Sequence, residues 1–398
     1  MADVRRLMPL VAVLVLVDTM LYSALTPLLP HFAANLGLSK SRAGVLVAAY
    51  AAGALVGGIP GGFFAAKIGA RRAVLVGLTL MGVASLGFAF AGGFWSLALA
   101  RFIQGGGSAF TWAGAFGWLL AVAPRERRGE LFGTAMGAAV FGSLFGPVVG
   151  AAAALAGRGP VFAALAGLSA VLAAWTLRIE TAPAEQPSLT ALLRALRQRR
   201  FLGGLALMAL PALLFGLLAV LAPLRLSEAG WGATAIGAVW LVGALIEGVM
   251  APSVGRLTDR RGAMLPVRIS LAGGVVCSIA LAAGTGPYVY AALVVVAGMA
   301  YGILFTPAFA LLADGAEQAG LAQGMGFGLM NAGWATGALV GPAAGGAIAA
   351  STGDRVPLLL AAALCAVFFA ATGRRSRHHG SAVLVDGLPG DAAGVGRE

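Results

Sequence analysis

The chain has few charged residues, cysteines and histidines for its length. Only 11% of its 398 residues are charged, whereas soluble domains carry about 25%, which excludes a soluble core of this size. The two cysteines, Cys277 and Cys365, lie within apolar stretches and outside any metal-ligand spacing. All three histidines lie outside apolar stretches, and the pair His378-His379 has no further ligand nearby. The sequence therefore predicts no metal site, no cofactor and no enzyme active site.

Apolar residues dominate the composition, at 60% of the chain, and the mean hydropathy is +0.92. A bilayer core of roughly 30 Å requires about 20 apolar residues in a helix. Backbone polar groups in lipid must bond within their own segment, so each such stretch is expected to be helical. We predict an all-α protein of the lipid bilayer with twelve transmembrane helices, at about residues 7–30, 42–63, 73–93, 95–122, 131–153, 160–178, 201–224, 232–254, 265–285, 287–312, 322–350 and 356–373. The first stretch is too long for a signal peptide and contains Asp18, so it is assigned to helix 1.

Two unrelated patterns repeat at nearly the same offset, about half the chain length. The stretch with Gly142, Gly146, Pro147 and Gly150 returns 195 residues later as Gly337, Gly341, Pro342 and Gly345. Residues 62–71 match residues 255–264, at an offset of 193. Such repetition indicates a duplicated unit. We therefore expect two pseudo-symmetric six-helix halves, residues 1–178 and 201–373, with a linker at 179–200 and a tail at 374–398.

The basic residues predict the orientation of the chain. With a cytoplasmic N-terminus, 21 Lys and Arg residues fall in cytoplasmic segments, five in outer segments and one, Arg101, inside a helix. Membrane proteins concentrate Lys and Arg in cytoplasmic loops, so both termini are predicted to be cytoplasmic. The net charge of +12 is divided among loops between apolar stretches, which argues against a nucleic-acid partner. We expect a monomeric multi-pass protein of the plasma or inner membrane.

The linker and the tail have compositions of their own. After Pro187, the leucines at 189, 192, 193 and 196 mark one face of a short helix, with arginines elsewhere. This pattern fits an interfacial helix, and an ordinary basic loop fits it as well. The tail after Arg374 is polar and rich in glycine, and is predicted to be disordered.

Asp18 places a carboxyl group near the middle of helix 1. It lies 11 residues into the first apolar stretch, about 17 Å from the inner end at 1.5 Å per residue. A charge at that depth is costly and marks a candidate functional site. Surroundings of low dielectric let such a group exchange protons near neutral pH. The alternative is a structural partner for a polar neighbour or for Arg101.

Two further charges are embedded in apolar stretches. Arg101 lies roughly 9 Å from the outer end of helix 4, where it either holds a nearby carboxylate ionised or extends to the outer interface. Glu247 lies about 10 Å inside helix 8, either as a second carboxylate for a proton or cation or in a structural role. The candidate cavity-lining residues are Tyr22, Gln104, Trp240 and Asn331.

The repeated segments carry no reactive groups. Glycines four residues apart let helices approach closely and proline kinks a helix, so the Gly-Pro segments are either a hinge or seal between the halves or ordinary tight packing. The embedded charges are not duplicated, as expected if they serve one central site.

Two loops are candidate cytoplasmic gate loops. Asp259 in the second loop is able to cap a helix. The residues of the two loops are Gly62, Lys67, Gly69, Arg71, Gly255, Asp259, Arg260 and Gly262.

Several of these motifs resemble the major facilitator superfamily over residues 5–373. Residues 255–262 resemble its cytoplasmic loop signature, and Arg101-x-x-Gln104-Gly105 resembles its helix 4 motif associated with proton coupling. Residues 142–151 resemble the helix 5 antiporter motif, with Ala151 in place of the final glycine, and residues 17–30 resemble helix 1 of twelve-helix drug/proton antiporters. Ala66 replaces the aspartate of the signature in the first half, so a charge relay through that carboxylate does not transfer.

The resemblance implies a major facilitator fold and a proton-driven antiporter that works by alternating access. We expect Asp18 to exchange a proton for a small lipophilic or cationic substrate, with Arg101 tuning that exchange, Glu247 assisting it and the proton gradient as the energy source. The alternative is a symporter or facilitator for a sugar or another small metabolite, although polar groups such as Gln104, Gln323 and Asn331 are sparse. A membrane scaffold or sensor would be expected to carry an additional soluble domain.

Overall fold

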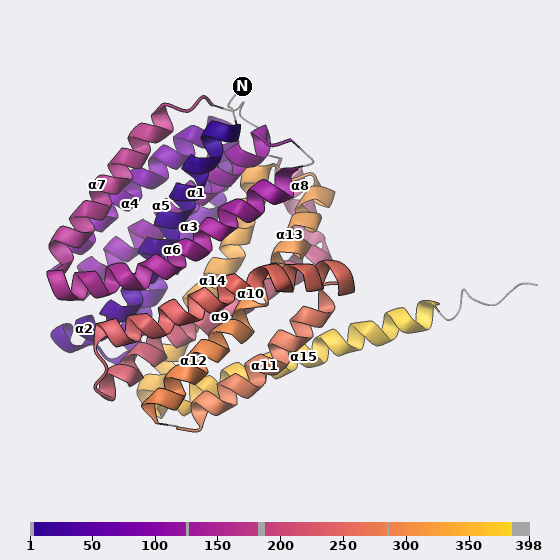
Figure 1. The fold of residues 1–398 in the computed structure, drawn as a ribbon. Coiled ribbons are helices and arrows are strands. Elements are labelled where there is room, and N and C mark those ends of the chain that lie inside the picture. The colour runs from indigo at the N-terminus through magenta and orange to yellow at the C-terminus, as the bar shows by residue number, and fades with distance from the viewer. Residues whose placement is uncertain (1–3, 125–126, 182–187, 285, 384–398) are drawn as a thin grey trace, which may run out of the picture.

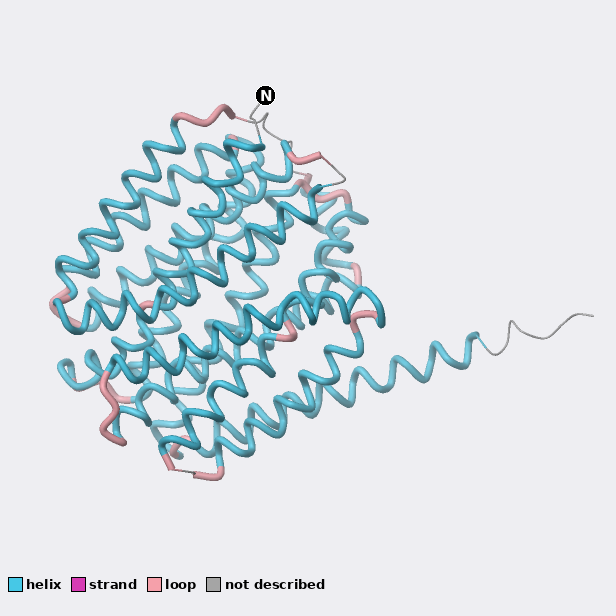
Figure 2. The backbone as a smooth tube through the Cα atoms, in the orientation of Figure 1, coloured by secondary structure: helices cyan, strands magenta, loops and turns pink. Residues whose placement is uncertain are grey.

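The computed structural model describes residues 4–124, 127–181, 188–284 and 286–383, and within these only the backbone of residues 128–129, 132, 200, 251–252, 259, 323 and 373–383. This part of the chain is helical throughout, with short connections and no strand (Figure 2). The prediction of an all-α protein is confirmed.

Fifteen helices make up the described chain. They are α1 (Val4–Ser23), α2 (Leu25–Leu36), α3 (Lys40–Ile68), α4 (Ala70–Phe90), α5 (Phe94–Val122), α6 (Arg128–Ala156), α7 (Arg158–Leu177), α8 (Leu189–Arg197), α9 (Arg199–Glu228), α10 (Ala233–Arg261), α11 (Met264–Ala282), α12 (Pro287–Gly302), α13 (Phe305–Ala319), α14 (Gln323–Thr352) and α15 (Arg355–Val383). Helices α1 and α2 form one crossing and α12 and α13 another, and α8 is the linker helix, which leaves the twelve predicted crossings.

Ten helical stretches are long and apolar enough to span a membrane, judged by length and composition. The other two crossings, α5 and α14, have 29 and 30 residues. Both are rich in glycine and carry polar residues such as Arg101 and Asn331, which lowers their hydropathy. They are interior helices that pack against α3 and against each other, so they need little apolar surface toward lipid. Large apolar side chains cover the outside instead: Phe90, Leu155 and Val249 are 77%, 80% and 71% exposed.

Proline explains the two interrupted crossings. Pro27 follows the break between α1 and α2, and Pro307 follows the break between α12 and α13. A proline has no N–H to donate to the carbonyl four residues earlier, and its ring crowds that carbonyl. The carbonyls of Ser23 and Ile303 are the ones affected, and each lies at the break itself.

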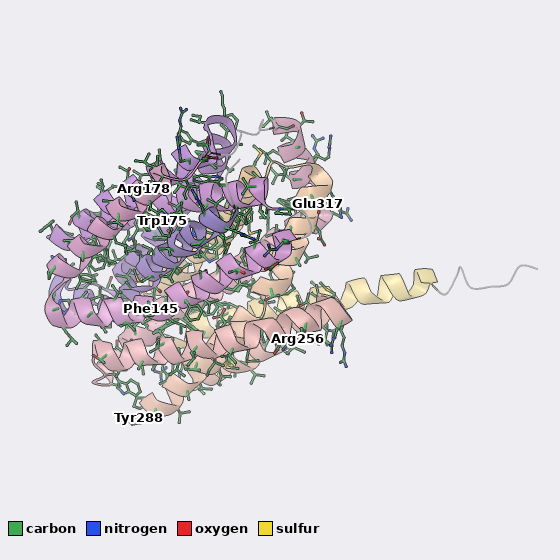
Figure 3. The ribbon with its side chains drawn as sticks, turned by 45° about the horizontal axis from the view of Figure 1, so that its top comes forward. Phe145, Trp175, Arg178, Arg256, Tyr288 and Glu317 are labelled. Atoms are coloured by element: carbon green, nitrogen blue, oxygen red, sulfur yellow. The ribbon has the colours of Figure 1, made fainter. Side chains whose placement is uncertain are left out.

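The two halves lie side by side, with α1–α7 in one and α9–α15 in the other (Figure 1). An even number of crossings places the N-terminus and the end of α15 on the same side. We call the end of the bundle that contains residues 36–40, 228–232 and 353–355 the outer end, and the opposite end the inner end, following the predicted orientation. Arg256 and Tyr288 lie at opposite ends of the second half (Figure 3), and Phe145 of α6 is among the exposed apolar side chains.

The halves meet chiefly along two pairs of helices, with α5 also packing on α14. Helices α3 and α14 touch over their whole length, from Gly44 beside Pro342 near the outer end to Gly62 beside Gly324 near the inner end. The other pair is α6 and α10. These two helices touch near the outer end, where Pro147 lies beside Gly237.

Helices α6 and α10 separate toward the inner end (Figure 1). Halfway along them, Val140 still contacts Gly248. Residues seven apart share a face of a helix, so Gly133 and Gly255 continue the two facing surfaces inward. Neither has an atom of the described chain within 4 Å of the place where its side chain would be. The structure is therefore closed at its outer end and parted at its inner end on this side.

The structure describes a helix in the linker and in the first residues of the tail. Helix α8 forms where a short helix was one of two alternatives, and Ser188 accepts a hydrogen bond from the Ala191 backbone N–H at its start. Its placement at a membrane interface stays a prediction. Helix α15 continues to Val383, beyond the expected start of the tail, and residues 384–398 lie outside the described chain.

Candidate functional site

Asp18 of α1 lies buried among donors from two other helices. It is 2% exposed. Its Oδ2 accepts hydrogen bonds from Trp112 Nε1 at 2.6 Å and Ser108 Oγ at 2.9 Å, both from α5. Tyr50 of α3 lies farther away, with its hydroxyl 3.3 Å from Oδ2 and 3.5 Å from Oδ1. Oδ1 is thus the less engaged oxygen within the described chain.

These partners suit both protonation states of the carboxyl group. The indole N–H of Trp112 can only donate, whereas the hydroxyls of Ser108 and Tyr50 can donate or accept. Ionised Asp18 therefore has three donors, and protonated Asp18 can direct its O–H toward a hydroxyl that rotates. A carboxyl group removed from water is costly when ionised, and charge-assisted hydrogen bonds offset part of that cost.

Arg101 of α5 binds the end of α1 where the first crossing breaks. Its guanidinium donates to the backbone carbonyls of Leu21 and Tyr22, each at 3.3 Å, and to Gln104 Oε1 at 2.7 Å. A cation at the last carbonyls of a helix also favours the helix dipole. The side chain is 2% exposed, and its Nε is buried without a partner in the described chain. Arg101 is thus held inside the bundle, and of the two alternatives the one in which it extends to the outer interface is wrong.

Tyr50 connects Asp18 with Arg101. Its hydroxyl reaches Asp18, while the Arg101 guanidinium lies 4.8 Å from the centre of its ring. The same ring packs on Tyr22, with ring centres 4.9 Å apart. Within the described residues no ion pair joins Asp18 directly to Arg101, so the aromatic ring separates the two charges.

An aromatic contact carries this cluster across to the second half. Trp334 of α14 packs on Tyr22 with ring centres 5.3 Å apart and on Tyr50 at 6.3 Å. Farther inward, Phe327 of α14 stacks on Phe116 of α5 at 4.7 Å. Aromatic side chains of both halves therefore meet where α14 packs against α1, α3 and α5.

The four candidate cavity-lining residues divide into two groups. Tyr22 and Gln104 belong to the cluster around Arg101. Asn331 lies one turn before Trp334 on α14, and its Nδ2 is buried without a partner in the described chain. Trp240 of α10 likewise has a buried Nε1 without a partner there. Asn331 therefore adjoins Trp334 along α14, and Trp240 is the only one of the four that belongs to α10.

Glu247 of α10 lies against the break in the second interrupted crossing. A methyl group added at Gly302, the last residue of α12, would lie 2.5 Å from Glu247 Oε1. Across the described chain, no hydrogen bond or ion pair links the Glu247 carboxylate to a side chain, and none joins it to the cluster of Asp18. The structure thus places the second carboxylate on the other half, beside the turn from α12 to α13.

The Gly-Pro segments pack mainly within each half. Methyl groups at Gly142, Gly146 and Gly150 of α6 would overlap α1 and the residues that follow it. The corresponding glycines of α14, which are Gly337, Gly341 and Gly345, contact α9 in the same way. At the prolines the halves also touch, because the carbonyl of Pro147 lies beside Gly237 and that of Pro342 beside Gly44, while the ring of Pro342 packs on Gly216 of its own half. The glycines thus take part in tight packing, and the role of these segments as a hinge or seal stays a prediction.

The two gate loops differ in their surroundings. Gly69 and Gly262 end α3 and α10 with φ of 107° and 77°, a backbone region that favours glycine. In the first loop, Gly62 contacts Gly324 of α14, Lys67 lies over Phe63, and Arg71 donates to the Ile179 carbonyl at 3.4 Å. In the second loop, Arg260 is exposed, and the side chain of Asp259 lies outside the described residues.

Sequence reasoning missed Tyr50, Trp112 and Trp334. Trp112 lies eleven residues after Arg101 on the same helix, near the same face at 3.6 residues per turn, so helical periodicity offered a signal. Tyr50 and Trp334 carry no such signal, because their contacts depend on the packing of α3 against α14.

Known proteins share both the sequence pattern and the architecture. The family model for the Major Facilitator Superfamily matches residues 11–326. The MFS-type transporter YcaD of Escherichia coli strain 536 is 25% identical over 268 residues, which cover 66% of this chain and 69% of that protein. The same protein of Salmonella enteritidis matches to the same extent.

Two solved structures have the same fold. The nucleoside transporter NupG superposes with a TM-score of 0.72 over 92% of this chain and 99% of its own, at 16% identity. The human organic anion transporter MFSD10 superposes with a TM-score of 0.70 over 94% of this chain and 100% of its own, at 16% identity. With two six-helix halves, this architecture and a family match over most of its length, the chain belongs to the Major Facilitator Superfamily of membrane transporters.

Proposed function

We propose that the protein is a proton-coupled antiporter that exports a small lipophilic or cationic compound by alternating access. Asp18 exchanges a proton for the substrate. Arg101 tunes that exchange through Tyr50, and Glu247 contributes a second proton- or cation-binding group. The proton gradient of the membrane supplies the energy.

The observation that carries this proposal is the environment of Asp18. Three donors from α3 and α5 surround a buried carboxyl group, and the less engaged oxygen, Oδ1, leaves capacity for a proton or for a cationic group of a substrate. A group that binds either of two competing cations links their movements, because one must leave before the other binds.

Contact between the halves at the same place supports coupling to conformation. Tyr50 contacts both Asp18 and Trp334, and Trp334 belongs to the half that must move relative to α1 and α3. A movement of Trp334 with its half would therefore act on the same ring that carries the hydrogen bond to Asp18. The parted inner ends of α6 and α10 fit the inward-facing member of two such states.

A second candidate substrate class is an organic anion. The Arg101 guanidinium is buried beside the cluster, and its Nε lacks a partner in the described chain. A buried donor of that kind suits a carboxylate or phosphate group. The two structural neighbours are named as transporters of nucleosides and of organic anions. Both classes of compound therefore belong in the substrate panel.

The test is a transport assay with the purified protein in proteoliposomes under an imposed pH gradient. The panel contains lipophilic cations, organic anions and nucleosides. We expect a cation to move in the direction opposite to the protons. Asp18→Asn should lower the rate of this coupled transport by at least about tenfold, which corresponds to about 1.4 kcal/mol or more of lost binding free energy for the proton or the cation. Glu317→Gln removes an exposed carboxylate of α13 and serves as the control.

Two results would contradict the proposal. If Asp18→Asn transported as well as the wild type under the gradient, proton exchange at Asp18 would be wrong. If only anions moved, and Arg101→Gln abolished their movement while Asp18→Asn did not, the second candidate would replace the first.

A further inference from the structure

We propose that Lys40, Glu228 and Asp354 form an ion-pair latch that holds the outer ends of the two halves together. Lys40 begins α3 in the first half. Its Nζ lies 2.8 Å from Asp354 Oδ1 and 3.5 Å from Glu228 Oε1. Glu228 ends α9, and Asp354 lies in the turn between α14 and α15, so both carboxylates belong to the second half.

The backbone beneath the latch fixes its position. A methyl group at Gly346 of α14 would lie 2.5 Å from the Lys40 carbonyl oxygen and 3.1 Å from Gly44 Cα. Glycine at this position lets the start of α3 rest directly on α14. The backbone of Lys40 therefore lies at a contact between the halves, and its side chain reaches Asp354 in the turn that follows α14.

Partial burial makes these ion pairs stronger than ordinary surface pairs. The side chains of Lys40 and Asp354 are 25% and 12% exposed, whereas that of Glu228 is 62% exposed. Charges partly removed from water interact more strongly and are screened less by salt. Lys40–Asp354 is thus the principal pair, and Glu228 adds to it from the rim.

The second half carries basic groups next to the same carboxylates. Arg225 lies one turn before Glu228 and over the ring of Tyr290, 4.3 Å from its centre. Arg355 follows Asp354 in the chain, and its Nη2 lies 3.4 Å from the side-chain position of Gly284. When Lys40 moves away with the first half, these arginines stay in the second half with Glu228 and Asp354. Positive charge on the same half should therefore lessen the cost of separating Lys40 from the two carboxylates.

The latch acts whatever the substrate is, because it biases the equilibrium between outer-closed and outer-open states. It rests on alternating access alone, and not on proton exchange at Asp18. A distance measurement without substrate or pH gradient therefore separates its failure from a failure of the proposed function.

The test measures the separation of the outer ends with spin labels in proteoliposomes. Labels at Ala34→Cys in α2 and Ala235→Cys in α10 report on the two halves, because both positions are exposed and both native cysteines are buried. We expect Lys40→Gln to raise the ratio of outer-open to outer-closed molecules about fivefold, and Lys40→Glu to raise it further. Lys40→Arg keeps the charge and should preserve the closed distance.

Two further variants decide between a latch and a general loss of charge. Arg42 lies on the same turn of α3 as Lys40, and its guanidinium lies over the ring of Phe94 in the same half. Arg42→Gln therefore removes a cation without touching the latch, and it should leave the distances between the spin labels unchanged. Lys40→Glu combined with Asp354→Lys restores an attractive pair and should return the population toward the closed state. An unchanged distribution in Lys40→Gln, or an equal change in Arg42→Gln, overturns the proposal.

Discussion

The close packing of Gly142 of α6 against α1 predicts the effect of replacing this glycine. A methyl group at Gly142 would overlap the Leu16 carbonyl oxygen and Thr19 Oγ1 of α1. Thr19 Oγ1 also donates to the Ala139 carbonyl at 2.9 Å, which joins α1 to α6. A backbone carbonyl cannot rotate away like a side chain, so Gly142→Ala must push the two helices apart.

The magnitude follows from two opposing effects. Overpacking a well-packed interior costs about 1–3 kcal/mol, and here the upper part of that range applies because the obstacle is backbone. Alanine is preferred to glycine inside a helix by about 1 kcal/mol, which leaves a net loss of about 2 kcal/mol. With an unfolding entropy of about 2.1 cal/mol/K per residue, a chain of 398 residues should unfold about 2–3 °C lower.

The assay is thermal unfolding of the purified protein in detergent, followed by intrinsic fluorescence at one fixed scan rate. Gly133→Ala is the matched control, because it lies on the same helix and nothing in the described chain is within 4 Å of its side-chain position. We expect Gly133→Ala to unfold at or slightly above the wild-type temperature. A Gly142→Ala variant as stable as the wild type would refute the packing argument, and so would an equal loss in the control.

Two other features give predictions of their own. Gly302→Ala should displace the Glu247 carboxylate and lower coupled transport by about tenfold, an effect of 1–2 kcal/mol, whereas Gly298→Ala meets only Phe215 Cε1 at 3.7 Å and should transport normally. If Gly302→Ala and Glu247→Gln changed the pH profile of transport in different ways, the contact between the two residues would not be what matters. On α8, a spin label at Leu193→Cys should be accessible to oxygen in the bilayer, because Leu193 is 48% exposed on the face opposite the packed Ala191 and Ala195; accessibility only to a water-soluble reagent would place that face in water.

The sequence was sufficient for the crossings and their pairing into halves. Length, hydropathy and the two repeats determine these features, because each depends on local composition or on spacing along the chain. The turns at Gly69 and Gly262 belong here too, since only glycine adopts their positive φ at little cost.

The interrupted crossings show where local reasoning ends. Pro27 and Pro307 each accompany a break, yet Pro147 and Pro342 lie within unbroken helices. A proline removes the same hydrogen bond in each case, and the surrounding packing decides whether the helix bends or stops. At the first break, Arg101 binds the carbonyls of Leu21 and Tyr22, so part of the decision comes from another helix.

The cluster around Asp18 shows the same limit for the site. The carboxyl group could be identified from its depth in an apolar stretch, because charge in that setting is costly. Its partners could be identified only in part. Ser108 and Trp112 lie on one helix at related positions, whereas Tyr50 and Trp334 are brought together by the contact between α3 and α14. Contacts between distant segments depend on three-dimensional packing, which one sequence without the fold does not encode in any local pattern.

The two gate loops show how a symmetric framework supports an asymmetric state. Gly62 contacts α14 of the opposite half, while the side-chain position of Gly255 is free of described atoms within 4 Å. If the repeat alone decided packing, both loops would have equivalent contacts. Instead α3 stays against α14 from end to end, and α6 separates inward from α10 beyond Val140. At the outer end, Lys40 reaches Asp354 near the contact of α3 with α14, which is where we propose the latch. We therefore expect that opening of the outer end separates Lys40 from Asp354 as well as Tyr50 from Trp334 deeper in the bundle.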